Sequence, residues 1–462
     1  VAIGYVALAS ATTAADNVVV GNAAGFNITD SQYNVGVGNN AMQSLTTGDR
    51  NVAIGHSTMY NLSTASDNTA VGFNAGVLVT TGAENVLMGS YAGDAITTGA
   101  SNIAMGYNAL GSVTTASYNV GIGQSAGGAV TTGIKNTLMG FAAGDALTTG
   151  FNNIAIGYDA MGTNTTSGAN VAIGYEALKV YNNTADASHM NVAVGTQAGK
   201  ALTDGERNVI IGGTAGDGAT TIDDCVIIGY NAGGGATMTG HDNTLVGKDA
   251  GEFITSGQNN TYIGKDAGIG ITGAPLTGDN NTAVGKNAGL LFQGAAQNNT
   301  AIGVDALRSL TTGSGNVAVG VASGAQNAMI NVTSEDNRAI FGHATITNSY
   351  VEVDWTVTSD ARDKMNFAEV PHGLSFVNNL QPIKFDFKKS RDDATPHGRT
   401  RYGFKAQDIL ALEGDSPVII DNEFEDKLKI TNSHLIPVLT KAVQELSTAL
   451  DAALARIATL EG

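Results

Sequence analysis

The chain has 462 residues, of which 42% are hydrophobic and 14% charged, so it can hold two or three domains and is too apolar for wholesale disorder. Its acidic residues outnumber its basic residues by 41 to 23, and the net charge of −18 argues against a nucleic-acid backbone as partner. The single cysteine, Cys225, excludes an intrachain disulfide. No run approaches the roughly 18 apolar residues of a membrane span, so we expect no membrane insertion. The chain opens in the middle of a pattern, at "VAIGY", without a methionine, and we expect that an upstream segment is missing.

The first three quarters of the chain consist of one short repeat. A glycine closes each pentad of the "NVAIG" type and returns every 17 residues, with a few longer steps. These repeat glycines are Gly4, Gly21, Gly38, Gly55, Gly72, Gly89, Gly106, Gly123, Gly140, Gly157, Gly174, Gly195, Gly212, Gly229, Gly247, Gly264, Gly285, Gly303, Gly320 and Gly342. One unit supplies a strand and a turn, and it can bury its apolar residues only by stacking on its neighbours. The sequence therefore predicts a mainly-β protein in which residues 1–342 form a repetitive parallel β-solenoid or β-roll rod of about twenty units.

Each unit carries an alternating apolar pattern before its glycine. The residue directly before the glycine is apolar, as in Ile54 and Met88, and the residue two places earlier is nearly always Val, Ile or Thr. These two positions lie on one face of a strand, and we expect stacked neighbours to bury the stripe that they form. A turn such as "TTG" precedes the next strand. Proline is nearly absent, as expected if almost every strand donates hydrogen bonds to a neighbour.

Asparagine holds the position four residues before the repeat glycine in every unit from Asn17 to Asn316 except one. Stacked identical amides can hydrogen-bond to one another along the axis of a parallel β stack, so we predict an internal structural ladder. Its first members are Asn17, Asn34, Asn51, Asn68, Asn85, Asn102, Asn119, Asn136, Asn153 and Asn170. Cys225 takes this position in one unit and Arg338 in the last. We interpret Cys225 as a substituted rung and not as a reactive thiol.

Some units are longer than the others. Extra residues follow Gly174, Gly264 and Gly320, in "KVYNNTADASH", "GITGAPL" and "AQNAMINVTSED". Loops that project from a rigid scaffold are common recognition sites, but drift on a permissive surface explains the same lengths. The aspartates of the scattered "AGD" steps are expected to be solvated turn residues. The seven histidines show no metal-ligand spacing, and we expect no metal site and no cofactor.

The composition changes near residue 342. Five of the 61 glycines and five of the six prolines lie after this point. We assign residues 343–358 to a junction and residues 359–462 to a small α+β domain. Within this domain "PIKFDFK" alternates like a strand, "RYGFKAQDILAL" indicates a strand followed by a helix, and "SPVIIDN" is a second apolar strand.

The last part of the chain has apolar residues spaced alternately three and four apart, which is the seam of a coiled coil. The seam residues are Ile436, Leu439, Val443, Leu446, Leu450, Ala453, Ile457 and Leu460. The pattern predicts a self-associating coiled-coil helix over residues 433–462. The alternative is an amphipathic helix that packs on its own domain.

Two resemblances extend this interpretation. The repeats resemble the 17-residue "NTAIGxxAG...TTG" arrays of phage tail fibres, and their pentads are similar to the "NSVAIG" coils in the heads of trimeric bacterial adhesins. The ordered steps "SDARDK", "LQPIKFDFK", "RYGFKAQDI", "LIPVLTKAVQEL" and "ATLEG" resemble the C-terminal intramolecular chaperone of endosialidase-type phage tailspikes and neck appendages. This second resemblance covers residues 359–462. It implies a homotrimer with a trimeric coiled coil, in which the chaperone assembles the upstream rod and then cuts itself off.

The same resemblance implies a catalytic site in "TSDARDK". Ser359 is the implied nucleophile, the bond between Ser359 and Asp360 is the one cleaved, and Lys364 is the implied general base. A lysine can accept a proton near neutral pH only if burial or a neighbouring cation lowers its pKa, and assembly can provide that burial. Without the resemblance, a serine and a lysine five residues apart indicate nothing.

Three more residues bear on the resemblance. Gln407 and Asp408 match the "AQD" step of the family, which implies that they support the fold. Tyr402 departs from the family pattern, because many members have histidine at this position. The departure bears on how efficiently the chain is cleaved and not on which domain this is.

The sequence thus favours a fragment of a homotrimeric phage tail fibre, a structural shaft that binds a host cell-surface receptor, either a glycan or a surface protein. The expected location is the virion tail, in contact with the outside of the host cell. Enzymatic activity is expected only as single-turnover self-cleavage. The alternatives are a bacterial trimeric surface adhesin with the same modules and a polysaccharide-degrading tailspike.

Overall fold

A computed structural model describes residues 1–183, 188–325, 331–343, 346, 359–388, 393–423 and 428–461. The chain divides into two compact units, Val1–Ala344 and Thr345–Gly462, and each is described by itself. The predicted junction, residues 343–358, lies almost entirely outside the described residues, and so do parts of two inserted loops, at 184–187 and 326–330.

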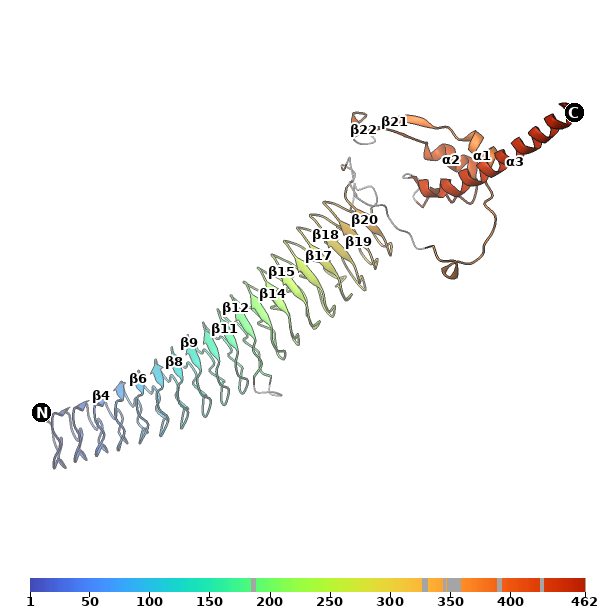
Figure 1. The fold of residues 1–462 in the computed structure, drawn as a ribbon. Coiled ribbons are helices and arrows are strands. Elements are labelled where there is room, and N and C mark those ends of the chain that lie inside the picture. The colour runs from blue at the N-terminus through green and yellow to red at the C-terminus, as the bar shows by residue number, and fades with distance from the viewer. Residues whose placement is uncertain are drawn as a thin grey trace. The chain divides into compact units, whose positions relative to one another are not determined.

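The first unit is a stack of short strands, one per repeat, in a single 20-stranded sheet (Figure 1). Each strand ends directly before a repeat glycine. The strands are β1 (Ala2–Ile3), β2 (Val18–Val20), β3 (Val35–Val37), β4 (Val52–Ile54), β5 (Thr69–Val71), β6 (Val86–Met88), β7 (Ile103–Met105), β8 (Val120–Ile122), β9 (Thr137–Met139), β10 (Ile154–Ile156), β11 (Val171–Ile173), β12 (Val192–Val194), β13 (Val209–Ile211), β14 (Val226–Ile228), β15 (Thr244–Val246), β16 (Thr261–Ile263), β17 (Thr282–Val284), β18 (Thr300–Ile302), β19 (Val317–Val319) and β20 (Ala339–Phe341).

Every strand of this sheet pairs in parallel with the next strand of the same chain. Val52 of β4 lies opposite Thr69 of β5, one repeat later. The register survives the insertions, because Val171 of β11 pairs with Val192 of β12 and the extra residues stay outside the strands. One repeat is therefore one coil, and at about 4.8 Å per coil the stack makes a rod roughly 90 Å long. The predicted fold class, a parallel β-solenoid, is confirmed.

This pairing also determines whether copies of the chain can interwind. Each strand from β2 to β19 has both of its hydrogen-bonding neighbours within its own chain. No second chain can insert a strand between them. Copies of the rod can therefore lie side by side but cannot interwind through this sheet.

The core of the rod consists of small and medium-sized side chains stacked in columns along the axis. From β2 to β19 the middle residue of each strand is buried, as in Ala53, Ala70 and Leu87. The alanine three residues after the repeat glycine, such as Ala75, and the aliphatic residue seven after it, such as Val79, belong to the same core cluster. Alanine recurs because the coil is narrow and close packing leaves little room for larger side chains.

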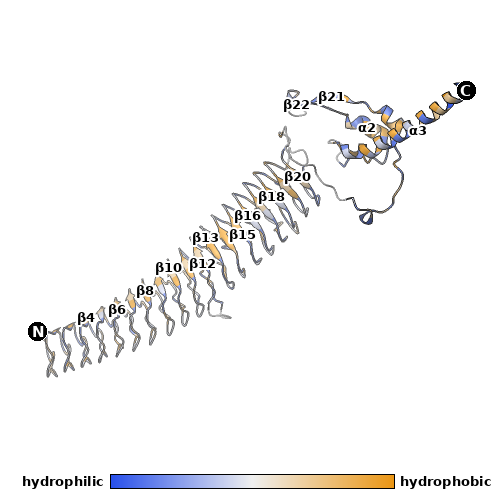
Figure 2. Cartoon of the chain, viewed as in Figure 1, coloured by the Kyte–Doolittle hydropathy of each residue, from blue (hydrophilic) through white to orange (hydrophobic). Residues whose placement is uncertain are grey.

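The two outer residues of each strand point away from this core. Ile54 and Met88, which directly precede repeat glycines, are each 40% exposed. The prediction that stacked neighbours bury this stripe is therefore wrong. Strand residues alternate between faces, so a three-residue strand directs its middle residue inward and the two flanking residues outward. Because most of the flanking residues are apolar as well, the strands form a largely hydrophobic band along the rod (Figure 2).

The repeat glycine bends the chain sharply after each strand. Gly55 has a φ of +137°, and a Cβ on it would lie 2.4 Å from the carbonyl oxygen of Gly72 in the next coil. Successive glycines thus stack with their backbones nearly in contact. Only glycine tolerates both this dihedral angle and this close approach, which explains why the position never varies.

The second unit is a small domain with a short hairpin and a long terminal helix (Figure 1). Its elements are η1 (Ala361–Asp363), α1 (Leu374–Asn379), β21 (Ile383–Lys388), β22 (Pro396–Gly403), α2 (Ala406–Glu413), β23 (Ile420–Asp421), β24 (Lys429–Ile430), η2 (Asn432–His434) and α3 (Leu435–Glu461). β21 pairs antiparallel with β22, and β23 pairs antiparallel with β24. The buried core of the domain is formed by Phe376, Leu380, Ile409, Ile419, Ile420, Leu435 and Val438.

The long helix α3 has two apolar faces. On the first face, Leu435, Val438 and Ala442 are buried in the interior of the domain. The predicted seam residues lie elsewhere on the helix and are mostly exposed, with Leu446 at 54% and Leu450 at 57%. Packing on its own domain therefore accounts for the first face of α3 but not for the seam, and self-association through the seam stays a prediction. No helix in the described part of the chain is both long enough and apolar enough to span a bilayer.

Candidate functional site

A tight turn at the start of the second unit brings the predicted serine and lysine together. Asp360 caps the 3-10 helix η1, because its Oδ1 accepts a hydrogen bond of 2.9 Å from the backbone N–H of Arg362. The backbone N–H of Asp363 donates to the carbonyl oxygen of Asp360 at 3.1 Å. The turn places Lys364 beside Ser359, and Nζ of the lysine donates to Oγ of the serine at 2.6 Å.

An ion pair reinforces this turn. Nη2 of Arg362 lies 2.6 Å from Oδ2 of Asp360. The hydrogen bonds from the Arg362 side chain and backbone hold the pKa of the Asp360 carboxyl below its usual value. The carboxylate therefore stays ionised at neutral pH, and the cap that sets the spacing of the serine and lysine persists there.

The pair can activate the serine only after the lysine loses a proton. A protonated amine donates to the hydroxyl oxygen and cannot accept the hydroxyl proton. Loss of that proton near neutral pH requires that the amine be removed from water or approached by another cation. Ser359 and Lys364 are both exposed in the single chain. The geometry thus places a lysine amine within hydrogen-bonding distance of a serine hydroxyl at the surface of the single chain.

The other residues implied by the resemblance lie on different elements. Gln407 and Asp408 are in the first turn of α2, where Gln407 is exposed and Asp408 is half-buried. The backbone N–H of Asp408 donates to the carbonyl oxygen of Lys405 at 3.2 Å, as part of the helix start. Tyr402 is on β22, and its side chain is 86% exposed.

Two charged residues that the sequence analysis missed connect α3 to the segment after the serine–lysine turn. Nζ of Lys441 donates to the carbonyl oxygen of Val370 at 2.7 Å. Oε2 of Glu445 accepts from the backbone N–H of Leu374 at 2.7 Å. Both residues occupy ordinary polar positions of the heptad pattern, so no sequence signal distinguishes them. Their contacts fasten the segment around Val370 and Leu374 to α3.

The asparagines of the predicted ladder form a continuous chain of hydrogen bonds inside the rod. Nδ2 of Asn51 donates to Oδ1 of Asn34 at 3.1 Å and to the carbonyl oxygen of Ala65 at 2.9 Å. The backbone N–H of Asn51 donates to the same Oδ1 of Asn34 at 2.9 Å. The pattern continues with Asn68 on Asn51 and Asn85 on Asn68. Each amide thus satisfies buried backbone groups of the next coil and donates to the side chain of the asparagine before it.

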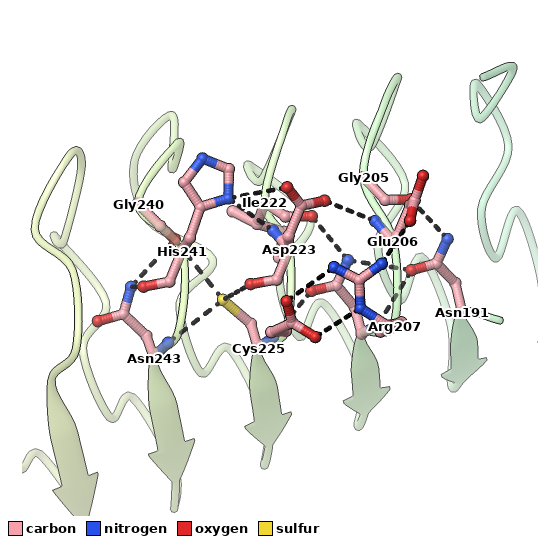
Figure 3. Close-up of polar contacts among 12 residues, drawn as sticks. Asn191, Gly205, Glu206, Arg207, Ile222, Asp223, Cys225, Gly240, His241 and Asn243 are labelled. Carbon is pink, nitrogen blue, oxygen red and sulfur yellow. Dashed lines mark hydrogen bonds and ion pairs between the residues drawn. The ribbon is translucent and has the colours of Figure 1, made fainter. Parts of the chain in front are cut away.

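Cys225 occupies one rung of this ladder (Figure 3). Its backbone N–H donates to Oδ1 of Asn208 at 3.0 Å, as an asparagine's would. Its Sγ accepts from the backbone N–H of Asn243 at 3.4 Å and donates toward the carbonyl oxygen of Asp223 at 3.3 Å. Burial raises the pKa of the Cys225 thiol to about 12. The thiol therefore stays protonated at physiological pH, as befits a structural and not a nucleophilic sulfur.

One carboxylate of the rod is unusually well paired. Oε1 of Glu176 lies 2.7 Å from Nζ of Lys179, and its Oε2 lies 2.8 Å from Nζ of Lys200 in the next coil. Nε2 of Gln197 also donates to Oε2 at 3.0 Å. The hydrogen bonds from Lys179, Lys200 and Gln197 lower the pKa of Glu176 to about 2.

The aspartates of the "AGD" steps differ from expectation. Asp94, Asp145 and Asp217 are half-buried, and desolvation raises the pKa of each. For Asp145 the charge of Asp159 raises it further. The prediction that these are solvated turn residues is wrong, because the stacking of coils covers turn positions that would be open in a single repeat. Within the described ranges, no three His, Cys, Asp or Glu side chains are grouped so as to hold a metal ion.

The region around the serine–lysine turn is similar to a known family. Residues 359–415 match the family described as "Chaperone of endosialidase". The match begins at Ser359 and includes Lys364 and helix α2. No curated protein is a match to the chain. A chaperone domain of the endosialidase type, joined in one chain to a β-solenoid rod, fits a tail-fibre or tailspike-like protein.

Proposed function

We propose that this chain is part of a homotrimeric phage tail fibre, in which the rod is a structural shaft and residues 359–462 assemble the trimer before they are cut off. The observation that carries this proposal is the 2.6 Å contact between Lys364 and Ser359, at the start of the segment that matches the chaperone family. The shaft binds a host cell-surface glycan or protein, and its inserted loops are the candidate contact points.

The chaperone is needed because the rod has many nearly equivalent registers. A shift between copies by one 17-residue coil would leave most contacts unchanged, so the rods have little means to align themselves. A helix that trimerises at one end sets a single alignment. α3 supports this role because its seam residues are exposed over the whole helix, including Ile436 near its start and Leu460 near its end.

Assembly then triggers the cleavage. When copies cover the turn, the buried Lys364 ammonium gives up its proton to solvent, and the free amine takes the proton of the Ser359 hydroxyl. The serine oxygen attacks a peptide carbonyl carbon, the bond to the nitrogen of Asp360 breaks, and the lysine returns the proton to that amine. Water hydrolyses the resulting ester and restores the serine. Loss of the chaperone leaves a trimer that cannot easily refold once unfolded, which is kinetic stability.

The geometry of a serine places a limit on this step. If Oγ of Ser359 attacked the carbonyl carbon of its own residue, a strained four-membered ring would form. The attacked bond between Ser359 and Asp360 is therefore assigned to a neighbouring copy in the trimer. This assignment agrees with a turn that is inactive while exposed in a single chain.

Freshly expressed full-length protein tests the site. Ser359→Ala is expected to yield no C-terminal fragment beginning at Asp360, as judged by denaturing gel and mass spectrometry. Lys364→Arg keeps the charge but cannot act as a base, so cleavage should be nearly absent. Lys405→Arg, which is the same change at an exposed lysine of the same domain, should cleave normally. Cleavage of the Ser359→Ala chain, or wild-type cleavage of Lys364→Arg, would show that an outside protease acts and that the dyad is wrongly assigned.

Mixed trimers test the transfer between copies. When tagged Ser359→Ala chains are expressed together with wild-type chains, the tagged chains should be cut between residues 359 and 360 by their neighbours. If only the wild-type chains in such trimers are cut, the step occurs within one chain.

A further inference from the structure

The outer face of the rod's sheet is an uncharged and mostly apolar strip. It consists of two columns of residues, one directly before the repeat glycine and one two places earlier. The first column, here called the strip column, holds Ile3, Val20, Val37, Ile54, Val71, Met88, Met105, Ile122, Met139, Ile156, Ile173, Val194, Ile211, Ile228, Val246, Ile263, Val284, Ile302, Val319 and Phe341. The second column holds only Val, Ile, Thr and Ala. Neither column has a charged residue, although 14% of the chain is charged.

This strip is accessible in the single chain along its length. Met105, Ile211 and Ile302 are 36%, 37% and 42% exposed, and they belong to β7, β13 and β18. Three extended residues span about 10 Å, and twenty strands about 4.8 Å apart span roughly 90 Å, so the strip covers on the order of 900 Å². The largest apolar patch on an ordinary monomer is about 300–600 Å², whereas a stable interface buries about 800 Å² on each partner. The strip therefore has the size of an interface and exceeds that of an incidental patch.

We infer that this strip is the surface by which copies of the rod pack against one another, side by side and parallel, with the strip toward the common axis. The inference rests on the homotrimer of the proposed function and adds to it the face that is buried. A second copy is the one partner whose side chains recur at the same spacing over every coil. Its side chains alone can therefore pack between those of the strip over the whole length from β1 to β20. A compact partner would cover only a few strands.

Charge favours the same occupant. A chain with a net charge of −18 is repelled by anionic lipid surfaces and by its own copies, so an uncharged face is where copies can approach. Two lysines that directly follow repeat glycines, at the margin of the strip, are already paired within the chain. Lys248 pairs with Asp249, and Lys265 pairs with Asp266. At these two coils a neighbouring copy therefore meets neutralised pairs.

The native methionines provide a test without mutation. Met88, Met105 and Met139 belong to the strip column, whereas Met190 is 54% exposed in a different column, five residues before its repeat glycine. Met42 and Met59 are fully buried in the core. The assembled protein, purified after expression of the whole 462-residue chain, is treated with hydrogen peroxide. Each methionine of the rod is followed by peptide mass spectrometry, and the mass of the assembly is measured by sedimentation.

The strip methionines are expected to oxidise about 10-fold or more slowly than Met190, at rates near those of Met42 and Met59. In a purified sample that sediments as a trimer, another copy provides this protection. If the particle is a trimer and the strip methionines oxidise as fast as Met190, the inference is overturned while the trimer of the proposed function stands. If the particle is a monomer, the trimer itself fails and the inference fails with it.

A pair of matched variants separates packing from folding. Met88→Glu with Met105→Glu puts carboxylates into the strip and should raise the oxidation rate of Met139 toward that of Met190. Tyr33→Glu with Tyr118→Glu places the same charges in the column of Met190, where Glu84 occurs naturally, and should leave Met139 protected. Slow oxidation of Met59 in both variants would show that the coils remain folded. Protection of Met139 in the strip variant would contradict the inference.

Discussion

Oδ1 of Asn34 accepts two hydrogen bonds from Asn51, one from the backbone N–H at 2.9 Å and one from the side-chain amide at 3.1 Å. The relationship makes each asparagine both a side-chain link and a backbone cap for the next coil. Because the links are fully buried, a missing rung leaves polar groups that water cannot reach.

We expect Asn102→Ala to destabilise the rod locally. The change leaves the backbone N–H of Asn119 and the carbonyl oxygen of Ala116 without their partners. Each unsatisfied buried group costs about 1–3 kcal/mol, so the loss should be several kcal/mol. Hydrogen exchange of the amides in the adjoining coils measures it. Asn39→Ala, at an exposed position of the same rod, is the control, and equal exchange in the two variants would refute the structural role of the ladder.

The thiol of Cys225 should be inert in the folded rod. With the pKa raised to about 12 by burial, almost none of it is thiolate at pH 8. Iodoacetamide is therefore expected to label the protein only after denaturation, as measured by intact mass. Rapid labelling of the native protein would mean that Cys225 is accessible and is not a rung.

Because of Glu176, the stability of the rod should depend on pH under acidic conditions. Its pKa is about 2 in the folded rod, below the ordinary value of 4.5, because Lys179, Lys200 and Gln197 bind the ionised form. A depressed pKa contributes stability that is complete above the ordinary value and is lost as the pH falls toward 2. Glu176→Gln should therefore unfold at lower temperature than the wild type at pH 7. The two should converge near pH 2, and a constant difference across this range would show that the contribution is not electrostatic.

The exposed seam of α3 should be essential for assembly. Leu446→Asp with Leu450→Asp places carboxylates where the coil would bury leucines, at a cost of several kcal/mol. We expect monomeric or insoluble protein, as measured by sedimentation and by the soluble fraction. Thr448→Asp with Ala455→Asp, on the side of the helix away from the seam, should assemble normally. Soluble heat-resistant trimers from the seam variant would show that the coil is dispensable.

The periodic sequence was enough to predict most of the rod. A glycine every 17 residues sets the length of the coil, and the alternation before it specifies a strand, because both are local properties of the backbone. The asparagine ladder could also be predicted, because residues at the same position of successive repeats stack on one another in a solenoid. In the second unit, the heptad spacing of residues such as Leu446 and Leu450 indicated a helix with an apolar seam.

The tertiary structure decided what lies inside. Ala53 and Ile54 are neighbours in one strand and both are apolar, so the pattern could not tell which of them faces the core. The narrow coil admits the small middle residue and leaves Ile54 outside. Stacking likewise half-buries Asp145, which in one isolated repeat would be a solvated turn residue. The contact between Lys364 and Ser359 is also three-dimensional, because it depends on the turn that Asp360 caps. Periodicity specifies which residues share a column, but only the cross-section of the folded coil determines which columns are buried.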